Sequence, residues 1–252
     1  MITAALHAWL VTATFVFAAG TAVALLFISA PYGRHVRAGW GPTIPARLGW
    51  VLMESPAVLW FGFVYLQGQY RAEPLPLLLL GAWMFHYVYR TFVFPFRLRI
   101  AGKRKPLLIV ALALVFNTLN ATINAAWISD LGPYAGAALA DPRVLVGMAV
   151  FAAGWALNQH SDQVLLNLRK PGETGYKIPY GGGYRYVTCP NYLGEIVQWC
   201  GWALAAGSLA GLAFAVYTAA NLVPRAITHH KWYREKFPDY PAERKAILPF
   251  VL

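Results

Sequence analysis

The chain has 252 residues, of which 58% are hydrophobic and 12% are charged, whereas about a quarter of the residues in a soluble domain are charged. This composition excludes a soluble globular domain, a disordered chain and a small disulfide-stapled fold, and it predicts an integral membrane protein. The formal net charge of +11 fits basic loops that flank membrane spans, so we expect contact with membrane lipid and no nucleic-acid partner.

Apolar stretches long enough to cross about 30 Å of hydrocarbon lie in five places along the chain. They cover residues 5–29, 48–67, 74–95, 106–128 and 143–167. A sixth stretch, 192–223, is too long for one crossing, and the small residues at 205–211 predict a break that divides it into two helices. We therefore predict an all-α, polytopic integral membrane protein, a single domain over 1–252 with seven transmembrane helices.

The Lys and Arg residues support this count, because cytoplasmic loops carry the excess of basic residues. With seven spans, 18 of the 21 basic residues fall in alternate connections and the C-terminal tail, among them Arg34 and Arg37. The N-terminus is therefore expected outside and the C-terminus in the cytosol. The short loops favour a bacterial inner membrane, while an endoplasmic reticulum membrane would suit the same pattern in a eukaryote.

Glu54 is an ionisable residue inside a predicted span, where it costs several kcal/mol unless it is paired or faces water, so it is a candidate for function. A helix that enters from the cytosolic side near Gly49 places Glu54 about 8 Å deep. The next span runs in the opposite direction and places Tyr87 about 12 Å deep, so we expect the two side chains to meet. Each residue also has a purely structural interpretation. Glu54 could be a neutral carboxyl that is hydrogen-bonded to a neighbouring helix, and Tyr87 could be one of the tyrosines common at membrane interfaces.

Polar side chains recur at helical spacing near the cytosolic ends of the last three spans. They form three rows: Asn158, Asp162 and Arg169, in line with the apolar Leu165; Asn191, Glu195 and Gln198; and Arg225, His229 and Tyr233. With the Gly-, Pro- and Tyr-rich loop 168–190, these rows predict a cytosol-facing pocket whose cations suit a phosphate-bearing ligand. The alternative is that the basic residues only set the topology and contact lipid.

A fourth polar row lies on one face of the fourth span, and it consists of Asn117, Asn120 and Asn124. Interhelical hydrogen bonding is the simpler interpretation of this row.

Several classes of site lack their motifs in this chain. G-x-G-x-x-G is absent, which excludes a Rossmann domain. The six histidines form no HExxH and too few clustered ligands, so we expect no metal site. Cys189 and Cys200 have neither metal-site nor disulfide-framework spacing and are expected to be free, inert thiols.

Long segments of the chain resemble the steroid 5-alpha-reductase family, membrane enzymes that reduce the double bond of 3-oxo-4-ene steroids with NADPH. In the C-terminal half they are HSDQVLLNLRKPGETGYKIPYGGGYRYV, NYLGEIVQWCGWAL and RAITHHKWYREKFPDYPAERKAILPF; upstream they are LGWVLMESPAVLW and HYVYRTFVF. The resemblance implies a seven-helix fold, a steroid substrate and NADPH as cofactor. Helices within 5–95 would carry the catalytic pair, and 143–252 would form the cofactor site.

The resemblance also assigns residues. Glu54 and Tyr87 match the family's catalytic glutamate and tyrosine, and Trp50, one turn before Glu54, is expected to contact the steroid. The cofactor contacts fall on Arg90, Asn158, Asp162, Arg169, Tyr176, Lys177, Asn191, Glu195, Arg225, His229 and Tyr233. Lys177 departs from the arginine of the animal members, and an ammonium lacks the bidentate phosphate grip of a guanidinium.

The implied reaction is hydride transfer from NADPH to C5 of a testosterone- or progesterone-type steroid, with the 3-keto oxygen polarised by Tyr87 and Glu54. Reduction of another membrane enone, such as a sterol, polyprenyl or enoyl-thioester substrate, is an alternative because sequence does not show pocket shape. A membrane methyltransferase that uses S-adenosylmethionine is another, and a seven-helix receptor or lipid-binding protein is a third. We expect no obligate protein partner.

Overall fold

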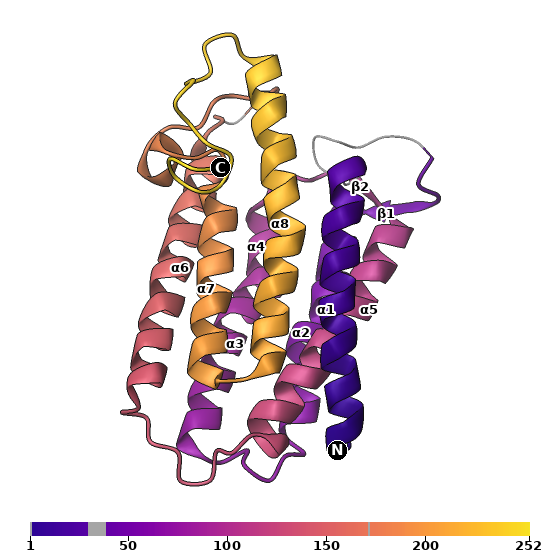
Figure 1. Cartoon of the computed structure of the whole chain (residues 1–252). Helices are drawn as coiled ribbons and strands as arrows, with labels where there is room; N and C mark the ends of the chain where they lie inside the picture. The colour runs from indigo at the N-terminus through magenta and orange to yellow at the C-terminus, as the bar shows by residue number, and fades with distance from the viewer. Residues whose placement is uncertain (1, 30–38, 171) are drawn as a thin grey trace.

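The computed structural model describes residues 2–29, 39–170 and 172–252. Its long helices run side by side, with the N-terminus at one end of the bundle and the C-terminal tail near the other (Figure 1). The helical elements are α1 (Ala4–Phe27), α2 (Ala46–Tyr65), α3 (Pro74–Val88), the π-helix η2 (Tyr89–Val93), α4 (Phe94–Arg97), α5 (Leu107–Ala126), the π-helix η3 (Trp127–Leu131), α6 (Pro142–Asn167), the 3-10 helix η4 (Gly182–Arg185), α7 (Pro190–Ala206) and α8 (Leu209–Lys236). Arg34 and Arg37 lie outside the described residues.

These elements form long helical runs at the predicted positions, which confirms a largely α-helical membrane protein. Within the described residues, five runs are long and apolar enough to cross a membrane: α1, α2, α3 through α4, α5 through η3, and α8. The remaining two, α6 and α7, occur where the sequence places them. Their assignment as spans, and the orientation of the two termini, remain predictions.

The predicted break in the sixth apolar stretch lies between α7 and α8. Gly207 takes a left-handed conformation with φ of 57°, which a glycine adopts without steric cost, and its N–H donates to Ala203 O at 2.9 Å. The Ser208 hydroxyl then accepts from Gly211 N at 2.8 Å and caps α8. The division into two helices is therefore confirmed.

A short antiparallel ribbon joins the beginnings of α2 and α5. Strand β1 (Thr43–Pro45) pairs with β2 (Arg104–Pro106), and Ile44 lies opposite Lys105. The Arg104 guanidinium adds a bond from Nε to Thr43 Oγ1 at 2.7 Å. Because each strand leads directly into its helix, the ribbon holds α2 and α5 at a common level.

Glycines bring α6 and α7 into backbone contact. A Cβ atom at Gly154 would lie 2.6 Å from the carbonyl oxygen of Gly194, and one at Gly201 would lie 2.6 Å from that of Gly147. A Cβ atom does not approach a backbone oxygen so closely, so glycine is required at this contact. The close approach fixes the polar rows of α6 and α7 relative to each other.

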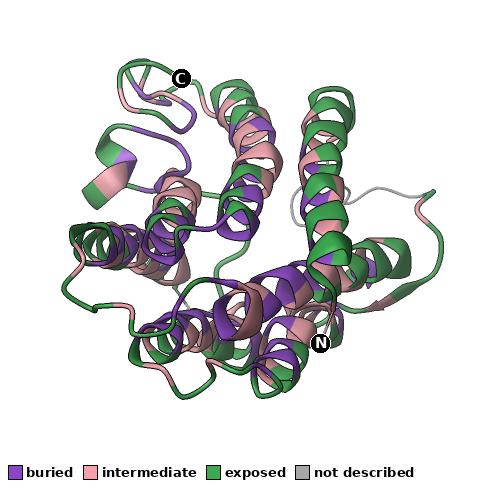
Figure 2. Cartoon of the chain, turned by 60° about the horizontal axis from the view of Figure 1, so that its bottom comes forward, coloured by how far each residue is buried: buried purple, intermediate pink, exposed green. Residues whose placement is uncertain are grey.

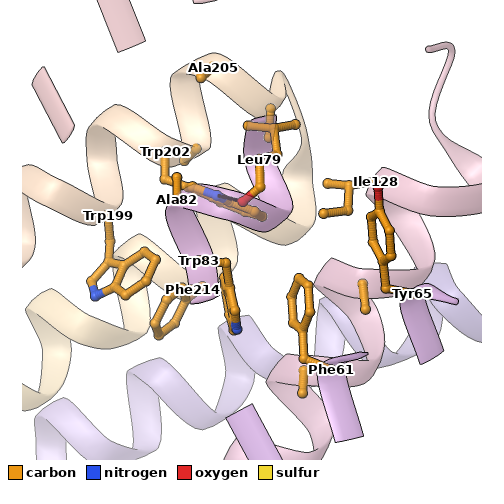
Figure 3. Close-up of a cluster of buried hydrophobic side chains, with 14 of the residues drawn as sticks. Phe61, Tyr65, Leu79, Ala82, Trp83, Ile128, Trp199, Trp202, Ala205 and Phe214 are labelled. Atoms are coloured by element: carbon orange, nitrogen blue, oxygen red, sulfur yellow. Dashed lines mark hydrogen bonds between the residues drawn. The ribbon is translucent and has the colours of Figure 1, made fainter. Parts of the chain in front are cut away.

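An aromatic cluster fills the core where α2, α3, α7 and α8 meet (Figure 3). Trp83 is fully buried, and its ring lies 4.3 Å from that of Phe61, 5.2 Å from those of Trp199 and Trp202, and 5.4 Å from that of Phe214. Large rings that bury 150–250 Å² each contribute strongly to packing. The cluster therefore anchors α3 against the C-terminal helices.

The outer faces of the helices are exposed, and the buried residues face the interior (Figure 2). Many of the exposed side chains are large and apolar, such as Trp9, Phe27 and Leu59. A soluble monomer rarely exposes so much contiguous apolar surface. Lipid contact accounts for it in a membrane protein.

Candidate functional site

The helix that carries Glu54 is fixed against the helix that carries Tyr87 by donors that reach backbone carbonyls. The three bonds are Trp83 Nε1 to Ala57 O at 2.7 Å, Thr91 Oγ1 to Glu54 O at 3.5 Å, and Trp50 Nε1 to Arg90 O at 3.0 Å. The three bonds are spaced along the contact between α2 and the antiparallel segment formed by α3 and η2. Glu54 and Tyr87 consequently lie at neighbouring levels of adjoining helices, within electrostatic range of each other.

Tyr87 is almost fully buried, at 5% exposure. Its ring lies 4.9 Å from that of Trp83 and 5.5 Å from that of Trp199. The neighbouring His86 is also buried, and its Nδ1 lies 2.9 Å from Nε2 of Gln198. Packing on several sides restricts the Tyr87 ring to one orientation, which is what a directed hydrogen-bond donor requires.

Arg90 connects the Glu54 region with α6 and α7. Its guanidinium lies 3.7 Å from the Glu195 carboxylate and 4.0 Å from that of Asp162. It also lies over the ring of Trp50, 4.9 Å from the centroid. Arg90 belongs to the π-helix η2, and such irregular turns occur often at functional sites. One cation is thus shared between two carboxylates at the centre of the bundle.

The polar rows of α6 and α7 bond to each other. Asn158 Nδ2 donates to Asn191 O at 2.9 Å, and Asn191 Nδ2 donates to Asp162 Oδ1 at 2.9 Å. Asn158 and Asp162 are buried. With Glu195, these residues form a polar wall beside Arg90 that presents carboxylate and amide groups, which bind hydroxyl and amide groups of a ligand.

The row on α8 is organised by Tyr192 of α7. Arg225 Nη2 donates to the Tyr192 hydroxyl at 3.0 Å, and His229 Nε2 lies 3.3 Å from the same oxygen. Tyr233 is buried and stacks on Tyr240 of the C-terminal tail, with ring centroids 5.3 Å apart. Arg225 and His229 therefore adjoin the α7 wall, whereas Tyr233 joins α8 to the tail.

The loop cations lie in a separate group at the surface. Arg169 Nη1 donates to Gly175 O at 2.9 Å, and Lys177 Nζ lies 2.6 Å from Glu173 Oε2. This hydrogen bond is the main cause that lowers the pKa of the Glu173 carboxyl. Tyr176 packs edge-on against Trp232 of α8, with ring centroids 4.9 Å apart.

One sequence expectation about this group is wrong. Arg169 was expected to continue the helical row of Asn158 and Asp162, but α6 ends at Asn167 and Leu168 caps it. Arg169 therefore belongs to the loop, where it bonds to the loop's own backbone. Neither cysteine forms a disulfide, as expected, and Cys189 is buried whereas Cys200 is exposed.

Lys105 lies beside the candidate site, although the sequence assigned it only to the basic residues that set the topology. Its Nζ lies 4.7 Å from the centre of the Trp50 ring and 3.5 Å from Met53 Sδ. Burial lowers the pKa of Lys105 to about 8; the nearby Glu54 carboxylate acts in the opposite direction, and Arg225 and Arg90 add to the lowering. A buried cation therefore stands close to the Glu54 carboxyl.

Asn117 is the second neighbour that the sequence did not assign to the site. Its Nδ2 donates to Met53 O at 2.6 Å and to Glu54 Oε2 at 3.4 Å. Asn120 and Asn124 bond to each other within α5, so this bond is intrahelical, and an interhelical role for those two stays a prediction. The row was visible in the sequence, but nothing local distinguishes Asn117 from the other two.

Comparison with known proteins adds a second line of evidence. Residues 103–252 match the family model described as 3-oxo-5-alpha-steroid 4-dehydrogenase. The chain is 43% identical over 242 residues to a steroid 5-alpha-reductase DET2 of Gossypium hirsutum, with 94% of each chain covered. It is 44% identical over 232 residues to a 3-oxo-5-alpha-steroid 4-dehydrogenase 1 of Rattus norvegicus, covering 91% of this chain and 89% of the other. It is 43% identical over 227 residues to the enzyme of the same name from Homo sapiens, covering 87% of this chain and 85% of the other.

Proposed function

The chain belongs to the 3-oxo-5-alpha-steroid 4-dehydrogenase family, and from this premise we propose that it catalyses the NADPH-dependent reduction of the 4,5 double bond of 3-oxo-4-ene steroids. Family membership makes it an oxidoreductase that acts on a CH–CH bond. Testosterone- and progesterone-type steroids are the proposed substrates, and 5-alpha-dihydro steroids are the products. The observation that carries the proposal is the position of Glu54 and the buried Tyr87 on adjoining helices beside the Arg90 centre.

Tyr87 and Glu54 supply the donors that this reaction needs. Hydride addition at C5 moves negative charge to the 3-keto oxygen, and protonation at C4 completes the reduction. Donors aimed at that oxygen lower the barrier, because they stabilise charge that develops only in the transition state. The Tyr87 hydroxyl donates to the ketone, and Glu54 holds the hydroxyl or donates as a neutral carboxylic acid. Trp50, one turn before Glu54 and against Arg90, forms a flat wall for the steroid.

The residues around Arg90 fit a nicotinamide dinucleotide by the chemistry of their donors and acceptors. When bound, NADPH supplies the hydride. Arg225, Arg169 and Lys177 are cations suited to its phosphates. Arg90 adds a further guanidinium. The remaining proposed contacts present hydroxyl, amide, carboxylate or imidazole groups, and they are Asn158, Asp162, Tyr176, Asn191, Glu195, His229 and Tyr233. The Asn158, Asn191 and Asp162 bonds support the proposal, because they orient the wall before any ligand arrives.

The proposal includes a seven-span, multi-pass topology with the N-terminus outside and the cofactor entering from the cytosol. The loop that carries Arg169 and Lys177 then lies on the cytosolic side, together with the C-terminal tail. The excess of basic residues in these connections supports this orientation. Residues 5–95 contribute the catalytic pair and 143–252 the cofactor site.

Product analysis tests the proposal. Detergent-solubilised protein is mixed with NADPH and progesterone, and the steroids are separated and identified by mass spectrometry. We expect a 5-alpha-dihydro product, and Glu54→Gln should form it roughly 10²–10³-fold more slowly while retaining NADPH. Glu73→Gln makes the same substitution at the opposite end of the bundle, immediately before α3, and should keep wild-type turnover.

Each other outcome rejects part of the proposal. NADPH retention without reduction of any 3-oxo-4-ene steroid would reject the steroid substrate in favour of another enone. Wild-type turnover in Glu54→Gln would reject the role of Glu54. Retention of S-adenosylmethionine in place of NADPH would reject a reductase and favour a methyltransferase.

A further inference from the structure

Asn117 connects α5 to both the backbone and the side chain of α2 at the proposed catalytic glutamate. Its Nδ2 donates to Met53 O at 2.6 Å and to Glu54 Oε2 at 3.4 Å. A carboxamide nitrogen carries two hydrogens, so it can serve both acceptors at once. The residue is 7% exposed, and water competes little for these bonds.

The segment of α2 that Asn117 contacts has an interrupted helical ladder. Pro56 lies inside α2 and has no N–H, so the carbonyl of Leu52 loses its usual donor. Side chains of other helices support the backbone next to it: Asn117 at Met53 O, Thr91 at Glu54 O and Trp83 at Ala57 O. Of these three donors, Asn117 is the one that also bonds to the Glu54 carboxyl.

The bond to Oε2 determines how Glu54 presents its two oxygens. In a neutral carboxylic acid the carbonyl oxygen is a stronger acceptor than the hydroxyl oxygen. The bond at Oε2 therefore favours the arrangement in which the proton of a neutral Glu54 is on Oε1. We propose that Asn117 is a positioning residue of the proposed steroid site, which fixes the Glu54 side chain through Oε2 and reserves Oε1 for proton donation. This inference rests on the proposed function, because it gives Asn117 a role only through Glu54.

The charged neighbours of Glu54 act differently from Asn117. Arg90, Lys105 and Glu195 influence the Glu54 carboxyl through their electrostatic fields. A field from several directions affects both carboxyl oxygens, whereas a hydrogen bond selects one of them. Asn117 is therefore the neighbour whose loss should misorient the carboxyl without changing the net charge of the site.

Asn120 provides a matched control for this residue. It lies one turn farther along the same helix and is fully buried, and its Oδ1 accepts from Asn124 Nδ2 at 2.8 Å. Leucine has nearly the shape of asparagine and no donor. Asn117→Leu and Asn120→Leu therefore make the same chemical change on one helix face, and only the first removes a donor from Glu54.

A double-mutant cycle with Glu54→Ala tests the inference. The turnover number and KM for progesterone are measured for the wild type, each single variant and Asn117→Leu/Glu54→Ala, with NADPH retention as the check of folding. We expect Asn117→Leu to lower kcat about tenfold, which is the effect expected from the loss of one directed hydrogen bond. The KM for the steroid should stay within twofold of the wild-type value. In the Glu54→Ala background it should lower kcat by less than twofold, because no carboxyl remains to be positioned. Asn120→Leu should keep wild-type kcat.

Two results would overturn the inference while leaving the proposed function intact. One is wild-type kcat in Asn117→Leu, and the other is a full tenfold loss that persists in the Glu54→Ala background, which indicates a general structural effect. If Asn117→Leu loses NADPH, Asn117→Ala replaces it in the same cycle. Failure of the proposed function is distinct, since the wild type itself would then form no 5-alpha-dihydro product.

Discussion

The polar wall of α6 and α7 and the proposed catalytic region of α2, η2 and α5 are held together by different means. In the first region the backbones touch, because Gly154 and Gly194 leave no side chain between them. In the second region the helices are joined by side chains such as Asn117, whose donors reach backbone carbonyls across the helix contact. Pro56 interrupts α2 there, and η2 departs from α-helical geometry.

This difference indicates what each region tolerates. A backbone contact has no flexible atoms that can adjust, so a small addition forces the helices apart. A contact made through side chains can adjust, and its loss changes the orientation of a few groups. We therefore expect substitutions in the α6–α7 contact to affect folding, and substitutions near Glu54 to affect turnover.

The largest effect should come from Gly194→Ala. The added Cβ would lie 2.5 Å from Asn158 N and 2.7 Å from Gly154 O, both backbone atoms. We expect no folded protein that retains NADPH, measured by size-exclusion chromatography and cofactor retention. Gly81→Ala is the control, because nothing lies within 4 Å of its new Cβ, and alanine favours a helix by up to about 1 kcal/mol. A wild-type melting temperature in Gly194→Ala would show that the contact between α6 and α7 does not require glycine.

Tyr87→Phe should affect chemistry and leave folding unchanged. Loss of one donor to the developing oxyanion lowers kcat by roughly 10²–10³-fold, while the buried ring keeps its packing. Tyr134→Phe is the contrasting control, because the Tyr134 hydroxyl bonds to Ala206 O at 2.5 Å. That variant should lose about 1 kcal/mol of stability and keep wild-type kcat. Equal kcat values for the two variants would refute the assignment.

Lys105→Met should stabilise the protein at neutral pH. Burial lowers the pKa of Lys105 from 10.5 to about 8, so the charged side chain costs the fold roughly 3 kcal/mol. The lost contacts with Trp50 and Met53 offset part of this gain. The cost is complete below pH 8 and disappears as the pH rises toward 10.5, because the folded state then holds a neutral lysine. The melting temperature of Lys105→Met should exceed that of the wild type at pH 7, and the difference should shrink at pH 9.5. A constant difference would argue against a buried lysine with a lowered pKa.

Lys177→Arg should produce the smallest effect. Lys177 lies on the exposed loop, where its ammonium contacts Glu173. A guanidinium would add a bidentate phosphate contact and lower Kd for NADPH by about two- to fivefold, measured by fluorescence titration. Lys236→Arg at the end of α8 should leave Kd unchanged. Weaker binding by Lys177→Arg would exclude a phosphate contact at this position.

The sequence predicted those features that depend on local pattern. Apolar length and the small residues around Gly207 located the helices and the division between α7 and α8. Helical spacing selected Asn158, Asp162 and Glu195, and depth along antiparallel helices selected Glu54 and Tyr87. Each of these inferences needs only the geometry of one helix or of two neighbouring helices.

The remaining features arise from contacts between distant segments. Asn117 and Glu54 are 63 residues apart, and their bond depends on the relative rotation of α5 and α2. Lys105 reaches Trp50 because the β1–β2 ribbon aligns the beginnings of the same two helices. The predicted span 143–167 ends where α6 ends, but the helical spacing of polar residues continues past that end and wrongly extended the row to Arg169.

Deuterium transfer tests the central claim most directly. The protein is incubated with progesterone and NADPH that carries deuterium at both C4 positions of the nicotinamide, and the steroid is analysed by mass spectrometry and NMR. We expect a 5-alpha-dihydro product with one deuterium, located at C5. A reduced steroid without deuterium, or progesterone recovered unchanged while NADPH remains bound, would contradict it.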